Sequence, residues 1–274
     1  MEKSIAIQGV MCSYHHMVSN AYFGKNTKIN QCLSFDFLAE SLANKESDCA
    51  VMAIENSIAG SIIPNYAIID ANAFNIVGEH YLDIQHQFMV LPGQTMEEIS
   101  EVHSHPMALL QCKTFLRQYP HVKLVEAEDT AVVAERIREK NLKGIAAIAG
   151  KLAAETYNLD VLAASIQTIK QNQTRFVILS NNKNKDISKS NKASIKFELD
   201  HKRGSLATIL NVMSDCKLSL TKIQSLPKIE EPWRYSFFVD VTFSELEDFI
   251  KAEKLISLMA THYKVLGIYN KAVL

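Results

Sequence analysis

The chain has 274 residues, of which 47% are hydrophobic and 22% charged, a composition typical of a soluble globular protein with length enough for two domains. Lysine plus arginine (29) nearly balances aspartate plus glutamate (30), which argues against a nucleic-acid or anionic-membrane partner. The five cysteines are scattered and include no C-x-x-C pair, so neither a disulfide framework nor a structural zinc site is expected. The apolar run after Met1 is too short for a signal peptide and no segment is long enough to span a bilayer, which predicts a cytoplasmic protein.

The first part of the chain has the pattern of strands followed by helices. Residues 4–7 form a short β-like run that ends at Gly9, and a helix is expected from Ser13 to about residue 22. Ser34 can cap a second helix, and the continuous apolar run 49–54 is typical of a strand buried on both faces of a parallel sheet. Ligands of open α/β sheets bind beyond the carboxyl ends of strands, where the turn at 9–14 and the loop at 55–61 would lie. The alternative for that loop is an ordinary βα turn with capping serines.

Residues 76–91 alternate apolar and polar side chains, which predicts one long, half-buried strand that crosses from one lobe to another. A second α/β unit follows, and the chain returns at 166–169. Two such lobes enclose a cleft, which is a common small-molecule site. The elements expected in the second unit are a strand at 102–103, a helix opened by Ser104-His105-Pro106, a helix from Asp129, a strand at 145–148 ending near Gly150, and a helix from Lys151.

His103 and His105 lie two residues apart, a spacing that on a strand can form part of a metal site. No acidic or cysteine partner is expected nearby. We therefore interpret His105 as a helix cap or a polar ligand contact, and no metal is predicted.

The run Asn172-Gln173-Thr174-Arg175-Phe176 enters an apolar segment and is predicted to be a strand, with Thr174 and Phe176 on one face and Arg175 on the other. The planar guanidinium of arginine matches a carboxylate, and a threonine hydroxyl can donate one hydrogen bond. Together they can hold a small acidic substrate. The alternative is that threonine is present as a strand former while Arg175 extends to solvent.

Residues 181–192 are polar and are predicted to be a linker. The following pattern has the β-α-β-β-α-β order of a ferredoxin-like sheet, whose open edges favour pairing with another copy. Its expected elements are a strand at 193–199, a turn at 201–204, a helix at 205–216, strands at 219–225 and 235–243, a helix at 245–258 and a strand at 263–269.

Three motifs occur in one order along the chain: Glu55-Asn56-Ser57-Ile58-Ala59-Gly60-Ser61, Ser104-His105-Pro106-Met107-Ala108-Leu109-Leu110-Gln111-Cys112, and Asn172-Gln173-Thr174-Arg175-Phe176. They resemble the Glu-Asn-Ser-x-x-Gly-Ser, Ser-His-Pro-x-Ala-Leu-x-Gln-Cys and Asn-x-Thr-Arg-Phe motifs of prephenate dehydratase with a C-terminal ACT regulatory domain. Two regions depart from the family pattern. Cys12 stands where the first motif of the family has a glycine, although Ser13 keeps a hydroxyl, and Gln224-Ser225-Leu226-Pro227 replaces the Glu-Ser-Arg-Pro of the ACT domain.

The resemblance implies an α/β fold in two parts. The first is a bilobal, periplasmic-binding-protein-like (type II) catalytic domain over residues 1–180, with lobe 1 at about 1–80 and 165–180 and lobe 2 at about 81–164. The linker at 181–192 would lead to an α+β ferredoxin-like ACT domain over residues 193–274.

The activity implied is conversion of prephenate to phenylpyruvate, water and carbon dioxide in phenylalanine biosynthesis, without metal or organic cofactor. Phenylalanine would be the allosteric effector of a homodimer or homotetramer. A competing function is a cytoplasmic protein that binds and senses a small aromatic acid or amino acid without catalysis. An ACT-regulated enzyme of other amino-acid chemistry would share the C-terminal part but not the three motifs.

By the same resemblance, Thr174 is the donor to the departing hydroxyl, Arg175 is a carboxylate anchor, and Glu55 is a rival acid. The substrate-binding residues implied are Gly9, Ser13, Asn56, Ser57, Ser104, His105, Gly150, Asn172 and Phe176. The effector-binding residues implied are Gly204, Ser205, Leu206, Gln224, Ser225, Leu226 and Pro227.

Overall fold

The computed structural model describes residues 3–200, 202–228, 231 and 233–273. The chain forms two compact units, one of Met1–Gly60 with Leu82–Phe176 and the other of Ser61–Tyr81 with Val177–Leu274. This division differs from the predicted domains because residues 61–81 and 177–180 group with the C-terminal part. The assignment of a catalytic and a regulatory domain stays a prediction.

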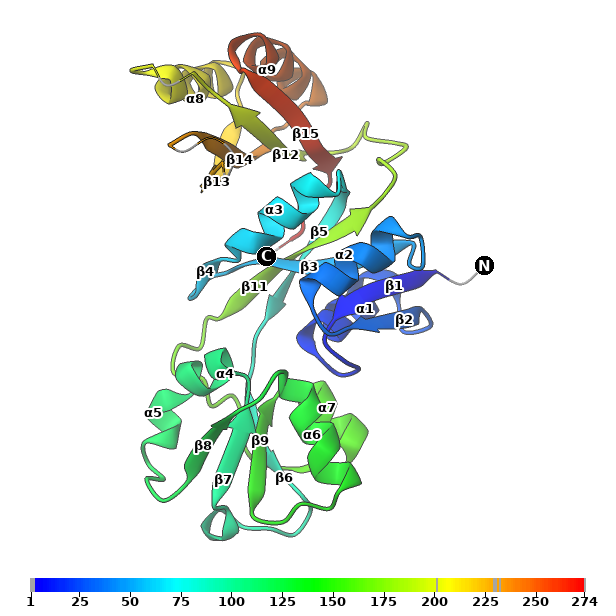
Figure 1. The fold of residues 1–274 in the computed structure, drawn as a ribbon, viewed down its shortest axis with the longest axis vertical. Helices are drawn as coiled ribbons and strands as arrows, with labels where there is room; N and C mark the ends of the chain where they lie inside the picture. Colours follow the sequence, from blue (N-terminus) through cyan, green and yellow to red (C-terminus); the bar gives the residue numbers. More distant parts are fainter. Residues whose placement is uncertain (1–2, 201, 229–230, 232, 274) are drawn as a thin grey trace. The chain divides into compact units, whose positions relative to one another are not determined.

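The first sheet is built around strands that follow one another along the chain. β1 (Ser4–Gln8) pairs in parallel with both β2 (Lys28–Cys32) and β3 (Cys49–Asn56) (Figure 1). The predicted cap at Ser34 is confirmed, since its side chain accepts a backbone amide at the start of α2 (Phe35–Ala43). Ser13, predicted only as the start of a helix, caps α1 (Tyr14–Phe23) in the same way. The full strand order is β2-β1-β3-β11-β5, with β4 beside β3; the remaining members are β4 (Gly60–Ser61), β5 (Asn75–Asp83) and β11 (Gln173–Ser180).

A second sheet of the first unit has the strand order β10-β6-β9-β7-β8. The central strands β7 and β9 are parallel, and β6 runs antiparallel to β9 and β10. The strands are β6 (Gln87–Val90), β7 (Glu101–Ser104), β8 (Lys123–Glu126), β9 (Ile145–Ala149) and β10 (Asp160–Ala163). The helices are η1 (Met96–Glu98, 3-10), α4 (Pro106–Gln111), α5 (Lys113–Leu116), α6 (Thr130–Glu139) and α7 (Lys151–Tyr157).

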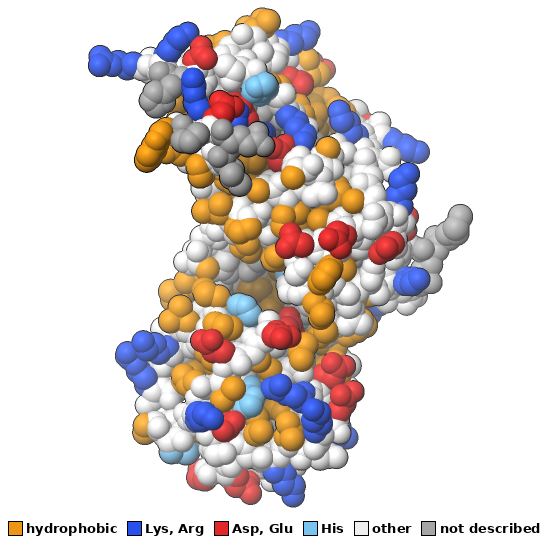
Figure 2. All heavy atoms as spheres, in the orientation of Figure 1, with side chains coloured by type: hydrophobic (Ala, Val, Ile, Leu, Met, Phe, Trp, Pro, Cys, Tyr) orange, Lys and Arg blue, Asp and Glu red, His pale blue; other side chains and the backbone are white. Residues whose placement is uncertain are grey.

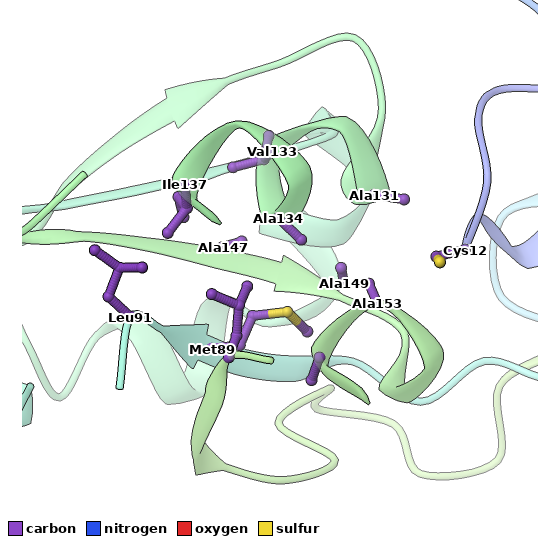
Figure 3. Packing of buried hydrophobic residues seen from close by; sticks show 12 residues of the cluster. Cys12, Met89, Leu91, Ala131, Val133, Ala134, Ile137, Ala147, Ala149 and Ala153 are labelled. Atoms are coloured by element: carbon purple, nitrogen blue, oxygen red, sulfur yellow. The ribbon is translucent and has the colours of Figure 1, made fainter. Parts of the chain in front are cut away.

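Hydrophobic clusters cover both faces of this second sheet, because successive strand residues point to opposite sides. Met89 and Ala147 belong to a cluster with Val133 and Ile137 of α6 (Figure 3). Their strand neighbours contribute to a separate cluster, which includes Phe88, Val90, Ala146 and Ile148 together with Leu109 of α4 and Leu116 of α5. Because both faces of the sheet are covered by apolar side chains, polar groups that could contact a ligand are expected at the ends of its strands.

The second unit contains the predicted β-α-β-β-α-β order. Its sheet is antiparallel with the strand order β13-β14-β12-β15, and Ile195 and Phe197 pack with Ile209 and Phe249 of the helices. The helix α3 (Ile63–Ala71) also belongs to this unit. His201, the first residue of the predicted turn at 201–204, lies outside the described residues. The elements are β12 (Lys192–Glu198), α8 (Ser205–Asp215), β13 (Ser219–Pro227), β14 (Tyr235–Thr242), α9 (Leu246–Met259) and β15 (His262–Tyr269).

The prediction of one long strand over 76–91 is wrong, because β5 ends at Asp83 and β6 begins at Gln87. Between them, the Ile84 amide donates to the Asn172 carbonyl at 2.6 Å and the His86 amide donates to Gln167 Oε1 at 3.0 Å. The returning strand predicted at 166–169 is also absent. Its amides at Ile166 and Thr168 donate to the carbonyls of His86, in the loop between β5 and β6, and of Gln111, in α4, so no ladder forms.

The surface and the titratable groups limit the classes of partner. On the face drawn in Figure 2, acidic and basic side chains are interspersed. Within the part of the chain that the structure describes, no helix is both long and apolar enough to cross a membrane. The same residues include no group of three or more His, Cys, Asp or Glu side chains that could hold a metal ion. We therefore take the polar groups near the ends of the strands as the candidate site for a small molecule.

Candidate functional site

Thr174 and Asn56 are joined by a side-chain hydrogen bond where β11 lies beside the end of β3. Asn56 Nδ2 donates to Thr174 Oγ1 at 2.9 Å and to Asn172 Oδ1 at 2.7 Å. It lies 3.3 Å from the Gln173 carbonyl oxygen, a longer contact. Thr174 and Asn56 are only 8% and 9% exposed, and Asn172 is fully buried. The structure thus brings three of the predicted site residues into direct contact.

Asn56 also shapes the loop that follows it. Its Oδ1 accepts the backbone amides of Ile58 and Ala59, each at 2.9 Å. Ser57 ties the same loop to β11, since its Oγ accepts the Gln173 amide at 3.0 Å and its own amide donates to the Gln173 carbonyl. The amides of Ile58 and Ala59 are therefore occupied within the loop, and the loop serves mainly to fix Asn56.

A chain of side-chain hydrogen bonds continues from Asn172 to Gln111 at the end of α4, to His86 between β5 and β6, and to Tyr14 of α1. Asn172 Nδ2 donates to Gln111 Oε1 at 2.9 Å, and His86 Nε2 lies 2.9 Å from the same oxygen. His86 Nδ1 in turn lies 2.9 Å from the Tyr14 hydroxyl. Gln111, His86 and Tyr14 were not among the predicted site residues. For Gln111 the signal was present, since it lies inside the second motif, whereas His86 lies in the run 76–91, which was predicted only to be a strand.

The direction of each bond in this chain can be assigned. Burial lowers the pKa of His86, against a smaller opposing effect of its bond to Gln111, so its ring is neutral near pH 7. Gln111 Oε1 can only accept, which places the ring proton on Nε2 and makes Nδ1 an acceptor. The single hydrogen of the Tyr14 hydroxyl is shared between this Nδ1, 2.9 Å away, and the Gln85 carbonyl oxygen, 3.1 Å away. At the other end Thr174 Oγ1 accepts from Asn56. Its own hydroxyl hydrogen has no acceptor among the described residues and is available to a ligand.

The residues that follow Thr174 are buried. Arg175 is 5% exposed, so the alternative in which it extends to solvent is wrong. Strand alternation places it on the face opposite Thr174. The ring of Phe176, 1% exposed, meets the ring of His15 edge-on with centroids 5.0 Å apart. Glu55 is half-buried in β3, next to Asn56. The roles assigned to Arg175, Phe176 and Glu55 stay predictions.

His15 is a buried histidine that the sequence pattern did not single out. It lies between Phe35 and Phe176, and its Nε2 accepts the Ala53 amide at 3.4 Å. Burial lowers the pKa of His15 to about 3. The ring is therefore a neutral acceptor that supports the strand behind Thr174.

Asp129 faces the first turn of the chain. Its Oδ1 accepts the amides of Ala131 and Val132 at 2.7 and 3.2 Å and so caps α6. Its Oδ2 lies toward Gly9, where an added Cβ would be only 2.8 Å away. Burial raises the pKa of Asp129, partly offset by the α6 amides and by His105. The sequence predicted Asp129 only as a helix start, because nothing in its neighbours shows which turn its second oxygen meets.

The other predicted residues at helix starts have separate partners. Ser104 is fully buried and donates to the Ile148 carbonyl at 2.6 Å, while His105 Nδ1 accepts the Met107 amide and caps α4, as expected. Gly150 begins α7 against the Tyr14 ring, where an added Cβ would lie 3.2 Å from a ring carbon. Ser13 caps α1 and is 3% exposed.

Cys12 takes the backbone conformation that glycine favours. Its φ is 67°, in the left-handed region, so the turn keeps a glycine-like geometry although a thiol is present. The side chain is 3% exposed and packs in the hydrophobic cluster of α6 and α7 (Figure 3). Burial raises the pKa of this thiol, which is therefore protonated at neutral pH.

His103 does have an acidic neighbour, contrary to expectation. Its Nε2 lies 2.7 Å from Glu101 Oε2, and its Nδ1 lies 3.0 Å from Arg136 Nη2. Both ring nitrogens are thus engaged by charged side chains of the second sheet and α6. Because Arg136 can only donate, Nδ1 accepts from it and Nε2 donates to Glu101, so His103 is a hydrogen-bonded bridge between the two side chains.

In the second unit, the predicted effector residues lie at one turn and on one strand. Gly204 has a φ of 83° and precedes α8 as its N-cap residue. The single hydrogen of the Ser205 hydroxyl is shared between the carbonyl oxygens of Lys202 and Asp200, 2.9 and 3.1 Å away. A cavity of about 210 Å³ lies beside this turn and is lined in part by Leu206, with Lys202, Arg234 and Phe237. Residues 224–227 form the end of β13, an edge strand of the sheet.

A family model described as prephenate dehydratase matches residues 5–184. The bifunctional chorismate mutase/prephenate dehydratase of Buchnera aphidicola (subsp. Schizaphis graminum) is 31% identical over 275 residues, which cover 97% of this chain and 70% of that protein. Among solved structures, the prephenate dehydratase of Arthrobacter aurescens in complex with L-Phe has a TM-score of 0.87 at 22% identity, covering 98% of this chain and 90% of that one. GqqA, described as a novel type of quorum quenching acylase, has a TM-score of 0.86 at 23% identity, covering 98% of each chain.

Proposed function

The chain belongs to the prephenate dehydratase family, and on that premise we propose that it converts prephenate to phenylpyruvate, water and carbon dioxide. Because a protein of the same fold is described as an acylase, the fold alone does not decide the activity. The observation that carries the proposal is the Thr174 hydroxyl, which Asn56 holds as an acceptor and whose hydrogen is available to a ligand.

The reaction needs no covalent bond between the protein and the substrate, because all the bonds that break or form belong to the substrate. The C–O bond of the ring hydroxyl breaks, the ring carboxylate leaves as carbon dioxide, and the electron pair of the broken C–C bond completes the aromatic ring. One proton is consumed as the hydroxyl leaves as water. A fixed hydrogen-bond donor at the departing oxygen stabilises the negative charge that develops there, and Thr174 is proposed as that donor.

The rest of the cleft would hold a dicarboxylate. Arg175 would supply a permanently charged guanidinium, although strand alternation places it opposite Thr174, so a bulge in β11 would be needed for both to face the ligand. Ser13 lies at the start of α1, where the helix dipole favours anions. The first amides of α6 are less suitable, since Asp129 already occupies them. Glu55 remains the alternative acid if Thr174 is not the donor.

We also propose that residues 1–180 are a bilobal, periplasmic-binding-protein-like domain and that residues 193–274 are a ferredoxin-like ACT domain. Phenylalanine would bind near Gly204–Leu206 and Gln224–Pro227, in a homodimer or homotetramer paired through its ACT domains. The described L-Phe complex of a structural relative and the cavity beside Ser205 and Leu206 support an amino-acid effector. The cytoplasmic location fits five free cysteines.

The direct test is incubation of the purified protein with prephenate near neutral pH, beside a protein-free control, with phenylpyruvate measured over time. Multiple turnovers support the dehydratase. Saturable binding of prephenate without product would instead support the competing function, a sensing protein.

A further inference from the structure

Residues 61–81, here called the inserted segment, consist of α3 and most of β5. They come between two stretches of the first unit, yet they pack as part of the second unit with residues 177–274. At one end of this segment lies the loop held by Asn56, and at the other lie Gln85 and His86. The contacts that hold the segment against the C-terminal sheet can therefore affect the positions of candidate-site residues just beyond its two ends.

Asp70, near the end of α3, is the first anchor. Its Oδ2 accepts from Lys196 Nζ at 2.7 Å and its Oδ1 accepts from Lys264 Nζ at 2.8 Å. Lys264 also donates to the Asp70 carbonyl oxygen at 3.0 Å. Burial alone would raise the pKa of Asp70, but the two lysines outweigh it and the pKa is lowered. The carboxylate is thus held between two neighbouring strands, β12 and β15.

Glu79 and Lys192 form the second anchor. Lys192 Nζ lies 2.7 and 3.0 Å from the two carboxylate oxygens of Glu79, and the side chains are only 2% and 0% exposed. The Ala272 amide donates to the same carboxylate at 3.1 Å. Two buried charges are expensive to desolvate, so such a pair is better suited to fixing one arrangement than to adding stability. Lys192 was predicted to belong to a linker, but it is the first residue of β12.

Between these anchors the backbones meet directly. A Cβ added to Gly267 of β15 would lie 2.0 Å from the Ile76 carbonyl oxygen, so only glycine fits there. The Asn184 side chain donates to the carbonyls of Val77 and Ile268 at 3.1 and 2.9 Å. The inserted segment is therefore fixed to the C-terminal sheet at three places along its length: at Asp70, at residues 76–77 and at Glu79.

We infer that the C-terminal sheet positions the candidate site through the inserted segment, with Glu79 and Lys192 as positioning residues. Because the segment is fixed to the sheet along its length, a displacement of β12 or β15 moves its two covalent ends, at Ser61 and Tyr81. Those ends continue into the Asn56 loop and into the segment that carries His86. The inference rests on the proposed function only for its effect on turnover.

The test replaces the buried pair by apolar side chains, Lys192→Met with Glu79→Leu, since replacement of both partners preserves folding better than loss of one. Lys228→Met is the matched control. It removes an ammonium bonded to Glu198 of the same sheet, without a hydrogen bond to the inserted segment. Thermal melting establishes that each variant is folded.

Hydrogen exchange is the main readout, at the hydrogen-bonded amides of Ile58 and Ala59 and of Ile84 and His86. Exchange at both ends should rise by on the order of tenfold in the double variant and stay unchanged in Lys228→Met. The specificity constant for prephenate, kcat/KM, should fall in the double variant only. Unchanged exchange at both ends in the folded double variant would overturn the inference. Absence of turnover in the wild type, with the exchange difference present, would instead refute only the proposed activity.

Discussion

Asn56 donates to the Thr174 hydroxyl across 2.9 Å while its own oxygen accepts the amides of Ile58 and Ala59. One side chain thus does two things: it shapes its own loop and it fixes the direction of the threonine hydroxyl. Because the hydroxyl accepts from Asn56, the only hydrogen it carries is left for the ligand. The proposed activity depends on this orientation.

Asn56→Asp separates the two roles of this residue. A carboxylate oxygen can still accept the loop amides, but the carboxylate cannot donate to Thr174 or to Asn172 Oδ1, and the threonine would donate to it instead. We expect kcat for prephenate to fall by on the order of a hundredfold, as for loss of one donor to a developing charge, with a smaller change in KM. Asn56→Ala, which loses both roles, should in addition show a lower urea midpoint. Unchanged kcat in Asn56→Asp would contradict this assignment.

Much of the fold could be predicted from local signals. Ser13, Ser34 and Asp129 mark helix starts because their side chains accept free amides, and these caps are visible in the sequence. The break between β5 and β6 could not be predicted, since Ile84 and His86 keep the alternation of a strand. Their amides bond to residues about eighty positions away, and no local pattern reports such partners.

The candidate site likewise has one part that the sequence identifies and another that only the structure shows. Asn56, Asn172 and Thr174 belong to short motifs, so the sequence identifies them. The link from Asn172 through Gln111 to His86 depends on how distant parts of the chain meet, which periodicity does not show. For Asp129, the facing residue Gly9 is 120 positions away, and only the structure relates the two.

His15 predicts a loss of stability in mild acid. Its folded pKa of about 3 lies below the ordinary value, so its contribution is present above pH 6.5 and is lost as the pH falls toward 3. At pH 5 the wild type should have lost about 2 kcal/mol of unfolding free energy through this group. His15→Gln, which cannot titrate but can accept from Ala53, should lose less between pH 7 and pH 5 in urea denaturation. His121→Gln, at an exposed position, should follow the wild type. Equal losses in all three proteins would refute the burial of an unprotonated His15.

The left-handed backbone of Cys12 predicts that glycine is tolerated at position 12. Cys12→Gly relieves a left-handed non-glycine residue but loses a buried thiol, so the free energy of unfolding should stay within about 1 kcal/mol of the wild type. Cys12→Val places a branched side chain at the same φ and should cost more than about 2 kcal/mol. Cys32→Val is the control, since Cys32 is buried in a strand, where valine is favoured. Urea denaturation of the three variants measures the difference, and equal costs for the two valines would contradict the backbone argument.

Ionisation of Asp129 is expected to lower the free energy of unfolding, because burial disfavours its charged form. Its folded pKa is raised, chiefly by burial, so its contribution is greatest below the unfolded value and is lost as the pH rises through the folded value. Asp129→Asn keeps the cap of α6 and cannot ionise, so its urea midpoint should exceed that of the wild type at pH 7. The gain should disappear as the pH falls toward 4. Glu128→Gln removes an exposed charge one residue away and should show no such gain. A gain that persists at pH 4 would mean that ionisation is not its cause.

The kcat of Thr174→Ala with prephenate tests the central claim most directly, measured beside Thr174→Ser and on variants shown to be folded. The alanine variant lacks the hydroxyl that Asn56 orients, so kcat should fall by on the order of a hundredfold or more while KM changes little. The serine variant keeps the donor and should retain most of the turnover. Near-normal kcat in Thr174→Ala would contradict the account and would make Glu55 the next acid to test.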